Sequence, residues 1–256
     1  MPITKKIKVI VFDLDGTLTK SRNKVTVSTA KLFCRLLNIK KVAVIGGGNY
    51  QQFQNQFLKY LPCSEFFNNL LILPTSGASM YFYHKNKWHK VYQKFLTKNE
   101  KQQIYQAFNK VFQKLNYRKP LKTYGKIFDD RQSQITFSAL GQLAPLTKKQ
   151  LWNKKNNKLR KQIAKELKKY LPDYVISLGG LTSIDITKQG IDKSYGIYQI
   201  MKFWNIGKED LIFIGDALFK GGNDYLVKKT GIKTIQVKNY RQSEKLIKDI
   251  LNKTFR

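Results

Sequence analysis

The sequence predicts an α/β fold, in which a Rossmann-like, doubly wound parallel sheet is interrupted by an inserted α+β domain. Near the N-terminus, short apolar runs rich in β-branched residues alternate with amphipathic helical stretches, a pattern typical of parallel sheets. This alternation stops near residue 85 and resumes near residue 186. A chain of 256 residues is long enough for a large core and a second unit.

The first part of the predicted core alternates strand and helix. Residues 7–12 are apolar and β-branched, which indicates a buried strand. Residues 26–38 fit a helix, and residues 41–49 (KVAVIGGGN) predict a second strand that is closed by three glycines. Apolar residues four apart predict a helix over 51–61, and residues 70–88 predict a strand, a turn and a hairpin.

The middle of the chain has a different pattern. Residues 97–116 fit an amphipathic helix, and residues 147–170 fit a second helix that carries ten basic residues and one acid. Residues 125–141 and 173–187 predict strands around these helices. Two helices among several strands make a compact α+β unit.

After this unit the strand and helix alternation returns, which makes the unit an insertion. Residues 192–207 predict a helix that ends at Gly207, and residues 211–217 and 234–239 predict two more strands. The expected domains are therefore a core, residues 1–84 and 186–256, and an inserted unit, the cap, residues 85–185.

The composition is strongly basic, with 48 Lys plus Arg against 16 Asp plus Glu and a formal net charge of +32. Such a charge suits a polyanion such as nucleic acid, but lysines spread along the whole chain also fit a solvated surface. No apolar run is long enough for a membrane span, and the short one near the N-terminus indicates a strand and not a signal peptide. Two cysteines, Cys34 and Cys63, predict a reducing compartment and no disulfide framework, so we expect a cytoplasmic protein.

Two acids, Asp13 and Asp15, follow the first strand directly, although like charges this close repel each other. A later strand, LIFIGD, ends in Asp216, and the second strand ends in glycines. The carboxyl ends of parallel strands meet at one edge of a sheet, where ligands bind. Carboxylate oxygens suit Mg²⁺, and a glycine backbone can approach a phosphate closely. The sequence therefore predicts a magnesium and phosphate site at this edge.

The motif FDLDGTLT, with Lys193 and GDALFKGGND downstream, resembles the haloacid dehalogenase superfamily of phosphotransferases, and the inserted cap is similar to that of its subfamily IIB. The core match spans residues 7–83 and about 186–240. The resemblance implies that Asp13 is the nucleophile that takes the phosphoryl group. It implies that Asp15 is the general acid and then the general base, and that Lys193 neutralises the phosphate.

The same resemblance implies the metal and phosphate ligands. Asp13, Asp216 and the backbone carbonyl of Asp15 would hold Mg²⁺. Most relatives have Ser or Thr at the end of the second strand, where this chain has Gly46. Phosphate binding would then fall to the backbone N–H groups of Gly46 and Gly47.

A closer resemblance is to the eukaryotic-type phosphomannomutases, carried by DLDGTLTKSRNKV, IGGGNYQQFQNQF, DRQSQITFSALGQ, GGLTSIDITKQGIDKSYGI and GDALFKGGNDY. It implies a phosphorylated sugar as substrate, bound between core and cap. An Arg can pair with phosphate in a bidentate manner, and a carboxylate can accept hydrogen bonds from hydroxyls. The implied substrate-binding residues are Arg22, Arg131, Gln142, Ser183 and Asp185, and the implied supporting residues of the metal loop are Asn223 and Asp224.

The cap departs from the phosphomannomutase pattern at two places. Gln142 stands where the family has a second Arg, and a further cap Arg maps to Lys148 or Lys149. A mutase must hold the non-reacting phosphate of a bisphosphate. Neither an amide nor a Lys can form the two parallel hydrogen bonds that an Arg guanidinium makes with a phosphate. We therefore predict a Mg²⁺-dependent phosphatase that acts on a phosphorylated sugar through an aspartyl phosphate. The alternative is a phosphomannomutase that interconverts mannose 6-phosphate and mannose 1-phosphate.

A further alternative is a nucleic-acid-binding protein that keeps this fold as a scaffold. The net charge of +32 favours it, and the intact set of catalytic residues opposes it. The resemblance also suggests a homodimer formed through the cap, although the sequence itself contains no interface signal.

Overall fold

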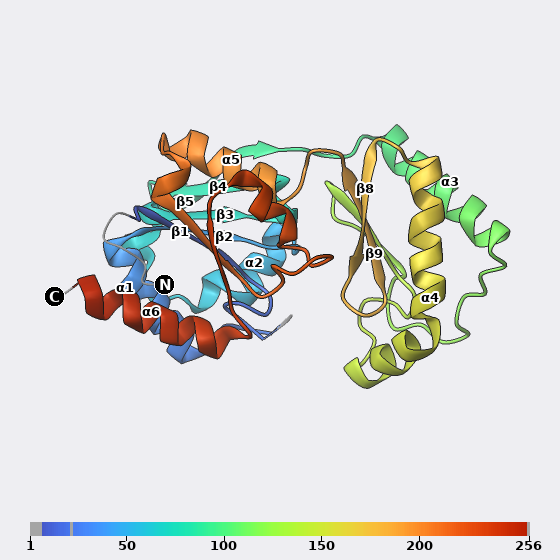
Figure 1. Cartoon of the computed structure of the whole chain (residues 1–256), viewed down its shortest axis with the longest axis horizontal. Helices are drawn as coiled ribbons and strands as arrows, with labels where there is room; N and C mark the ends of the chain where they lie inside the picture. The colour runs from blue at the N-terminus through green and yellow to red at the C-terminus, as the bar shows by residue number, and fades with distance from the viewer. Residues whose placement is uncertain (1–6, 21–22, 255–256) are drawn as a thin grey trace. The chain divides into compact units, whose positions relative to one another are not determined.

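The computed structural model describes residues 7–20 and 23–254 and divides the chain into two compact units (Figure 1). The core extends to Gln93 and resumes at Ile191, and the cap comprises Lys94–Gly190. Both boundaries lie later in the chain than the sequence predicted, because each hairpin stays within one unit. In the core, β4 (Ser79–His84) pairs with β5 (Lys87–Gln93), and in the cap, β8 (Tyr174–Gly179) pairs with β9 (Ser183–Lys188).

The core contains one seven-stranded sheet in the order β11-β10-β1-β2-β3-β4-β5. The strands from β11 to β3 run parallel, and β4 and β5 form an antiparallel edge. This confirms the predicted Rossmann-like sheet, and it brings the carboxyl ends of β1, β2 and β10 to one edge. The parallel strands are β1 (Val9–Asp13), β2 (Lys41–Ile45), β3 (Leu70–Leu73), β10 (Leu211–Gly215) and β11 (Lys233–Gln236).

Both faces of this sheet are buried, because alternate strand residues point to opposite sides. Ile10 and Phe12 of β1 pack with apolar residues of α1 and α6, and Val9 and Val11 pack with those of α5. Figure 1 shows α1 and α6 on one side of the sheet and α5 on the other. The core helices are α1 (Val27–Ile39), α2 (Tyr50–Gln56), α5 (Lys193–Trp204) and α6 (Tyr240–Thr254), with short 3-10 turns η1 (Leu58–Tyr60), η2 (Ser64–Asn69), η3 (Thr75–Gly77), η4 (Lys208–Asp210) and η5 (Tyr225–Thr230).

The cap is an antiparallel sheet with two helices, as predicted for the α+β insertion. Its strand order is β6-β7-β9-β8, and α3 and α4 cover one face (Figure 1). Ile135 and Phe137 of β7 pack with the apolar residues of these helices, so the alternating residues of β7 and β9 form a polar face on the other side. The elements not yet given are β6 (Phe128–Asp130), β7 (Gln134–Ser138), α3 (Lys98–Lys114) and α4 (Leu146–Tyr170).

Two helical stretches differ from the sequence prediction. The helix expected over 51–61 ends at Gln56, because Phe57 leaves helical geometry with φ −131° and ψ −65° before η1 begins. The C-terminal helix α6 was not predicted, although buried Ile247, Ile250 and Leu251 recur at helical spacing. No helix in the described part of the chain is both long and apolar enough to cross a membrane.

The expectation that the cysteines remain unpaired is wrong in this structure. A disulfide joins Cys34 in α1 to Cys63, which precedes η2, with their Cα atoms 5.8 Å apart. Packing of α1 against the η2 segment brings the two residues within the range that a disulfide requires. Cysteine count alone could not reveal this contact, because the two residues are 29 apart in sequence. The pairing also removes the basis on which the cysteines indicated a reducing compartment.

The disulfide closes a loop between two residues that are 29 apart in sequence. A loop of this size is expected to add roughly 3–4 kcal/mol to the free energy of unfolding. Urea unfolding with and without a reductant measures that contribution. The double variant Cys34→Ser, Cys63→Ser is the control, because its stability should not respond to the reductant. Two free thiols in protein purified without reductant, with the same stability in both conditions, would contradict the pairing.

Candidate active site

The side chain of Asp13 lies at the carboxyl end of β1, in the middle of the core sheet. It is 1% exposed, and its Oδ1 accepts a hydrogen bond from the Lys193 ammonium at 2.5 Å. Asp13 Oδ2 is also buried, and no described residue donates a hydrogen bond to it. A buried carboxylate oxygen without a partner is unfavourable by about 1–3 kcal/mol, so this atom is a candidate ligand for a cation.

Lys193 begins α5, and two local features fix its position. The Asp192 side chain caps the helix by accepting hydrogen bonds from the backbone N–H of Ser194 at 2.8 Å and of Tyr195 at 3.2 Å. One turn later, a Cβ atom at Gly196 would lie 2.6 Å from the Ile45 side chain, so only glycine lets α5 approach β2 this closely. The cap and this glycine together place the Lys193 ammonium at the end of β1.

Two further carboxylates come from the segment after β10. One carboxylate oxygen from each of Asp13, Asp216 and Asp224 lies within 4.8 Å of the others. Asp224 Oδ1 accepts a hydrogen bond from Lys193 at 2.5 Å, and its Oδ2 accepts one from the backbone N–H of Ala217 at 3.0 Å. Asp224 therefore closes the loop that carries Asp216 and also belongs to the acidic cluster, a larger role than the supporting one predicted.

The electrostatics of this cluster are unbalanced, because three carboxylates face one ammonium. Burial raises the pKa of Asp13 to about 8, and the attraction of Lys193 opposes this only in part. Burial also raises the pKa of Asp216, with repulsion from Asp224 adding to the effect. Burial acts to lower the pKa of Lys193, but the attraction of Asp13 and Asp224 outweighs it and raises that pKa. The cluster thus lacks positive charge.

These residues fit a divalent cation on three grounds. The ligand atoms are hard carboxylate oxygens, which Mg²⁺ prefers. Asp13 Oδ2 is buried and has no hydrogen-bond donor among the described residues. The two uncompensated negative charges of the cluster match the charge of one such ion. Asp13, Asp216 and Asp224 are therefore the candidate side-chain ligands of the metal, and the contribution of the Asp15 backbone carbonyl stays a prediction.

Asp15, the predicted acid and base, lies beside this cluster in the turn that follows β1. Its Oδ1 accepts a hydrogen bond from Gln56 Nε2 at 3.0 Å. Gly16 follows with φ +92°, and a Cβ atom there would collide with the carboxylate of Asp216. Thr17 donates to Asp216 Oδ1 at 3.4 Å. Sequence reasoning missed the contributions of Gln56 and Thr17. Thr17 belongs to the quoted motif, whereas Gln56 is 41 residues from Asp15 and gave no local signal.

The glycines after β2 differ from the prediction in one respect. The backbone N–H of Gly46 donates to the carbonyl oxygen of Leu73 at 3.2 Å, which continues the pairing of β2 with β3. This N–H is therefore used within the sheet, in disagreement with its assignment to phosphate. A Cβ atom at Gly46 would lie 3.2 Å from Leu14 Cβ and 3.3 Å from the Phe53 ring, so packing explains this glycine. Gly47 lies beyond the strand, where the phosphate assignment stays a prediction.

The remaining predicted core residues contribute less. Arg22 lies outside the described residues. Asn223 is exposed on the loop between Asp216 and Asp224, so its predicted support of Asp216 stays a prediction.

Four predicted substrate residues lie in the cap. On its polar face, Asp185 Oδ1 accepts a hydrogen bond from Thr136 at 2.7 Å, and the hydroxyl oxygens of Ser183 and Ser138 are 2.8 Å apart. Arg131 lies in the β6–β7 turn, where its Nε donates to Asp129 Oδ2 at 2.7 Å. Gln142 follows the other end of β7, so these two residues flank the strand at opposite ends. The polar face therefore gathers Ser183 and Asp185, whereas Arg131 and Gln142 lie in the segments before and after β7.

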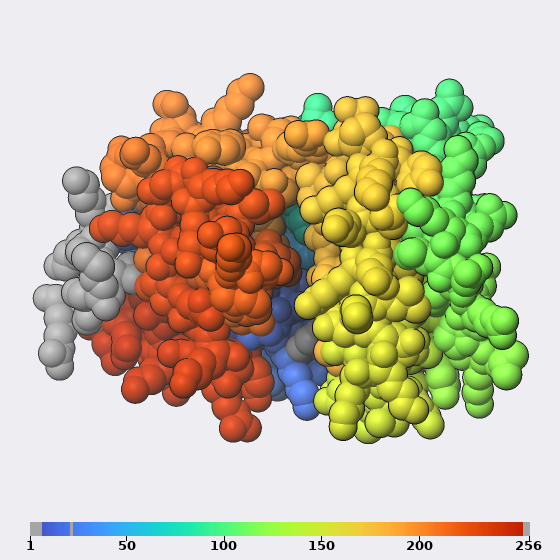
Figure 2. Space-filling model, turned by 45° about the vertical axis from the view of Figure 1, so that its right-hand side comes forward, coloured from blue at the N-terminus to red at the C-terminus, as the bar shows by residue number. Residues whose placement is uncertain are grey.

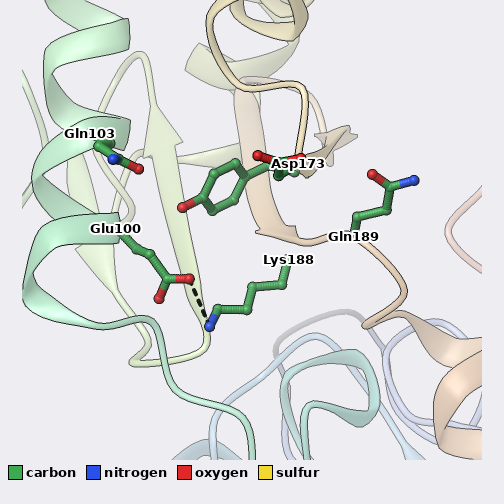
Figure 3. Close-up of a pocket in the computed structure, with 6 residues that line it drawn as sticks. Glu100, Gln103, Asp173, Lys188 and Gln189 are labelled. Atoms are coloured by element: carbon green, nitrogen blue, oxygen red, sulfur yellow. Dashed lines mark ion pairs between the residues drawn. The ribbon is translucent and has the colours of Figure 1, made fainter.

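A pocket of about 450 Å³ lies elsewhere in the cap, at the start of α3 and the end of β9 (Figure 3). Two of its three charged groups pair with each other, because Lys188 forms an ion pair with Glu100 at 2.7 Å. None of the predicted site residues lines it. The lining residues are Glu100, Gln103, Asp173, Tyr174, Lys188 and Gln189.

The basic helix α4 lies at the surface of the cap along its length (Figure 2). Lys149 donates to the carbonyl oxygen of Gln142 at 3.0 Å, and buried Arg160 donates to the carbonyl oxygen of Gly180 at 2.8 Å. The other basic residues of α4 are exposed: Lys148, Lys154, Lys155, Lys158, Lys161, Lys165, Lys168 and Lys169.

A Rossmann-like core with an inserted cap, and with acids and a lysine gathered at the strand ends, defines an α/β protein with a candidate metal-dependent active site at the edge of its core sheet. The sequence profile of the haloacid dehalogenase-like hydrolases matches residues 10–226. The chain belongs to this family of enzymes, which confirms the resemblance drawn from its motifs.

Curated relatives and solved structures agree with this family. A phosphomannomutase from Spinacia oleracea is 27% identical over 225 residues, which cover 85% of this chain and 84% of the relative. A phosphomannomutase from Encephalitozoon cuniculi is 27% identical over 257 residues, with 94% of each chain covered.

Among solved structures, the IMP-nucleotidase of Plasmodium falciparum has a TM-score of 0.70 at 18% identity, covering 96% of this chain and 71% of that one. A haloacid dehalogenase-like hydrolase from Bacteroides thetaiotaomicron has a TM-score of 0.62 at 15% identity, covering 95% of this chain and 99% of that one. These two structures share the fold.

Proposed function

We propose that this chain is a Mg²⁺-dependent phosphatase that removes phosphate from a phosphorylated sugar through an aspartyl phosphate on Asp13. The observation that carries the proposal is the buried carboxylate of Asp13, with one oxygen bonded to Lys193 and the other without a described donor. Of the two oxygens of this carboxylate, one would bind the metal and the other would attack phosphorus, and a nearby ammonium offsets the charge of an incoming phosphate.

The chemistry balances in two steps. In the first, a carboxylate oxygen of Asp13 attacks phosphorus, the bond from phosphorus to the sugar oxygen breaks, and Asp15 gives its proton to the departing oxygen. In the second, Asp15 takes a proton from water, the water oxygen attacks phosphorus, and the bond to Asp13 breaks. The products are the free sugar and inorganic phosphate, and both acids return to their starting state.

Mg²⁺ held by Asp13, Asp216 and Asp224 would supply positive charge to the phosphoryl oxygens as their charge develops. Lys193, whose ammonium donates to Asp13 Oδ1, would supply a second positive charge. The polar face of the cap sheet, with Ser183 and Asp185, offers hydroxyl and carboxylate partners for sugar hydroxyls.

Gln142 supports a phosphatase over a mutase. An amide at this position binds a second phosphate less strongly than an Arg fork does. The second candidate is a phosphomannomutase. Curated relatives carry this name, and the alignments to three of them cover 83–94% of their length, which favours this candidate.

Mannose 1-phosphate with Mg²⁺, with and without glucose 1,6-bisphosphate, separates these two functions. Inorganic phosphate without mannose 6-phosphate would support the phosphatase. Mannose 6-phosphate without inorganic phosphate, and only with the bisphosphate present, would overturn it in favour of the mutase. Failure to release phosphate from any of a panel of sugar phosphates would overturn the proposal as a whole.

Removing divalent ions with a chelator is expected to abolish phosphate release, and adding Mg²⁺ should restore it. Addition of Mg²⁺ to the metal-free protein should also raise the unfolding temperature, because the ion would bind the folded acidic cluster only. Asp216→Asn should weaken this stabilisation, whereas Asp249→Asn, at an exposed position on α6, should not. An unfolding temperature that does not respond to Mg²⁺ in the unaltered protein would contradict the metal site.

Nucleic-acid binding remains the alternative that the exposed lysines of α4 favour. Binding of an oligonucleotide that weakens steeply with salt, together with an absence of phosphatase activity, would favour that function.

A further inference from the structure

We propose that Gln56 is a positioning residue that holds Asp15 for proton transfer to the departing sugar oxygen. This inference rests on the proposed function and deepens it. The supporting contact is direct, because Gln56 Nε2 donates to Asp15 Oδ1 at 3.0 Å. The same amide nitrogen lies 3.3 Å from the carbonyl oxygen of Asn23, which follows in the loop after the motif.

The helix that carries Gln56 is firmly anchored. Phe53 within the helix and Phe57 at its C-cap are fully buried, and the Phe57 ring packs against Phe33 at a centroid distance of 4.9 Å. The carbonyl oxygen of Gln56 accepts a hydrogen bond from the backbone N–H of Val25 at 2.9 Å. The amide of Gln56 is thus presented by a fixed backbone, which is what precise placement of a catalytic acid requires.

The start of the same helix lies next to the glycines that follow β2. Asn49 caps α2, and Gln52 completes a capping box by accepting from the Asn49 backbone N–H at 2.8 Å. One short helix therefore joins the segment after β2 to the acid after β1.

A primary amide suits both states of the acid. Its N–H₂ group donates to a carboxylate, and it donates equally to the carbonyl oxygen of a protonated carboxyl group, which leaves the acidic hydrogen free to reach the departing oxygen. Gln56 can therefore orient Asp15 before and after the proton leaves, without a net charge of its own. A leucine at this position keeps a similar volume and loses both abilities.

The test compares Gln56→Leu with the unaltered protein on two substrates, a sugar phosphate and p-nitrophenyl phosphate. The p-nitrophenolate group leaves without a proton, so only the sugar phosphate needs Asp15 in the first step. Because kcat/KM reports the first step, it should fall about tenfold to a hundredfold on the sugar phosphate and less than about threefold on the aryl phosphate. The kcat values can fall for both substrates, since water attack also uses Asp15.

The control variant is Gln51→Leu, the same change at an exposed position of the same helix, where the amide bonds only Asn55 at 3.2 Å among the contacts described. It should leave kcat/KM unchanged on both substrates.

Equal losses of kcat/KM on both substrates for Gln56→Leu, or no loss on the sugar phosphate, would overturn the role of Gln56 while leaving the phosphatase proposal intact. If the unaltered protein does not turn over the aryl phosphate, an increase in KM without a change in kcat on the sugar phosphate overturns the role. A protein that is inactive without any substitution would instead reject the proposed function itself.

Discussion

Asp13→Asn is expected to abolish phosphate release while the protein stays folded. Asparagine has nearly the same shape, but its amide cannot form the bond to phosphorus, so the loss should be at least about 10⁴-fold in kcat. The fold should tolerate the change because Lys193 keeps its ion pair with Asp224. Removing one of three crowded carboxylates also relieves repulsion within the buried cluster. Phosphate release under saturating substrate measures the loss, and urea unfolding measures the stability.

Asp249→Asn is the matched control for this variant, because Asp249 is exposed on α6 and touches none of the cluster. It should keep full activity. Retention of more than about a hundredth of the activity by Asp13→Asn would contradict the nucleophile assignment, provided that the variant protein is folded.

Lys193→Met is expected to destabilise the metal-free protein by about 3–5 kcal/mol and to abolish phosphate release. Lys193 is 1% exposed and forms ion pairs with both Asp13 and Asp224 at 2.5 Å. Methionine keeps most of the apolar stem, but the buried carboxylates then have no positive partner, and an uncompensated buried charge is strongly destabilising. Addition of Mg²⁺ should recover part of the stability, since the ion restores positive charge to the cluster.

Lys8→Met tests whether this effect is specific to the buried pair. Lys8 pairs with Asp210 at 3.2 Å, but its side chain is 65% exposed, so the loss should be at most about 1 kcal/mol. Urea unfolding of both variants in the presence of a chelator gives the comparison. If Lys193→Met also lowered the free energy of unfolding by no more than Lys8→Met does, the buried carboxylates would not need the Lys193 ammonium, and the account of this ion pair would be wrong.

The arrangement of the core could be predicted because its signals are local. The apolar run before Asp13 marks β1, and LIFIGD marks β10. Parallel pairing of β1 with β10 then brings Asp13 and Asp216 to the same edge of the sheet. The start of α5 could be placed as well, because Asp192 is a strong N-cap residue directly before Lys193.

Features that depend on contacts distant in sequence could not be predicted. The disulfide between Cys34 and Cys63 requires the packing of α1 on the segment before η2. The hydrogen bond from Gln56 to Asp15 depends on where α2 ends, and helix ends are poorly marked where no glycine or proline stands. The use of the Gly46 N–H within the sheet depends on how far β3 extends beside β2. Each of these is decided by tertiary packing and not by local pattern.

During turnover, a carboxylate oxygen of Asp13 is expected to form a covalent bond to phosphorus. Rapid acid quenching of the protein with a sugar phosphate it hydrolyses, followed by mass spectrometry of its peptides, detects that bond. The expected result is one phosphoryl group on the peptide that contains Asp13, and none in Asp13→Asn. Steady release of phosphate with the phosphoryl group on another peptide, or with the same labelling in Asp13→Asn, would contradict the account.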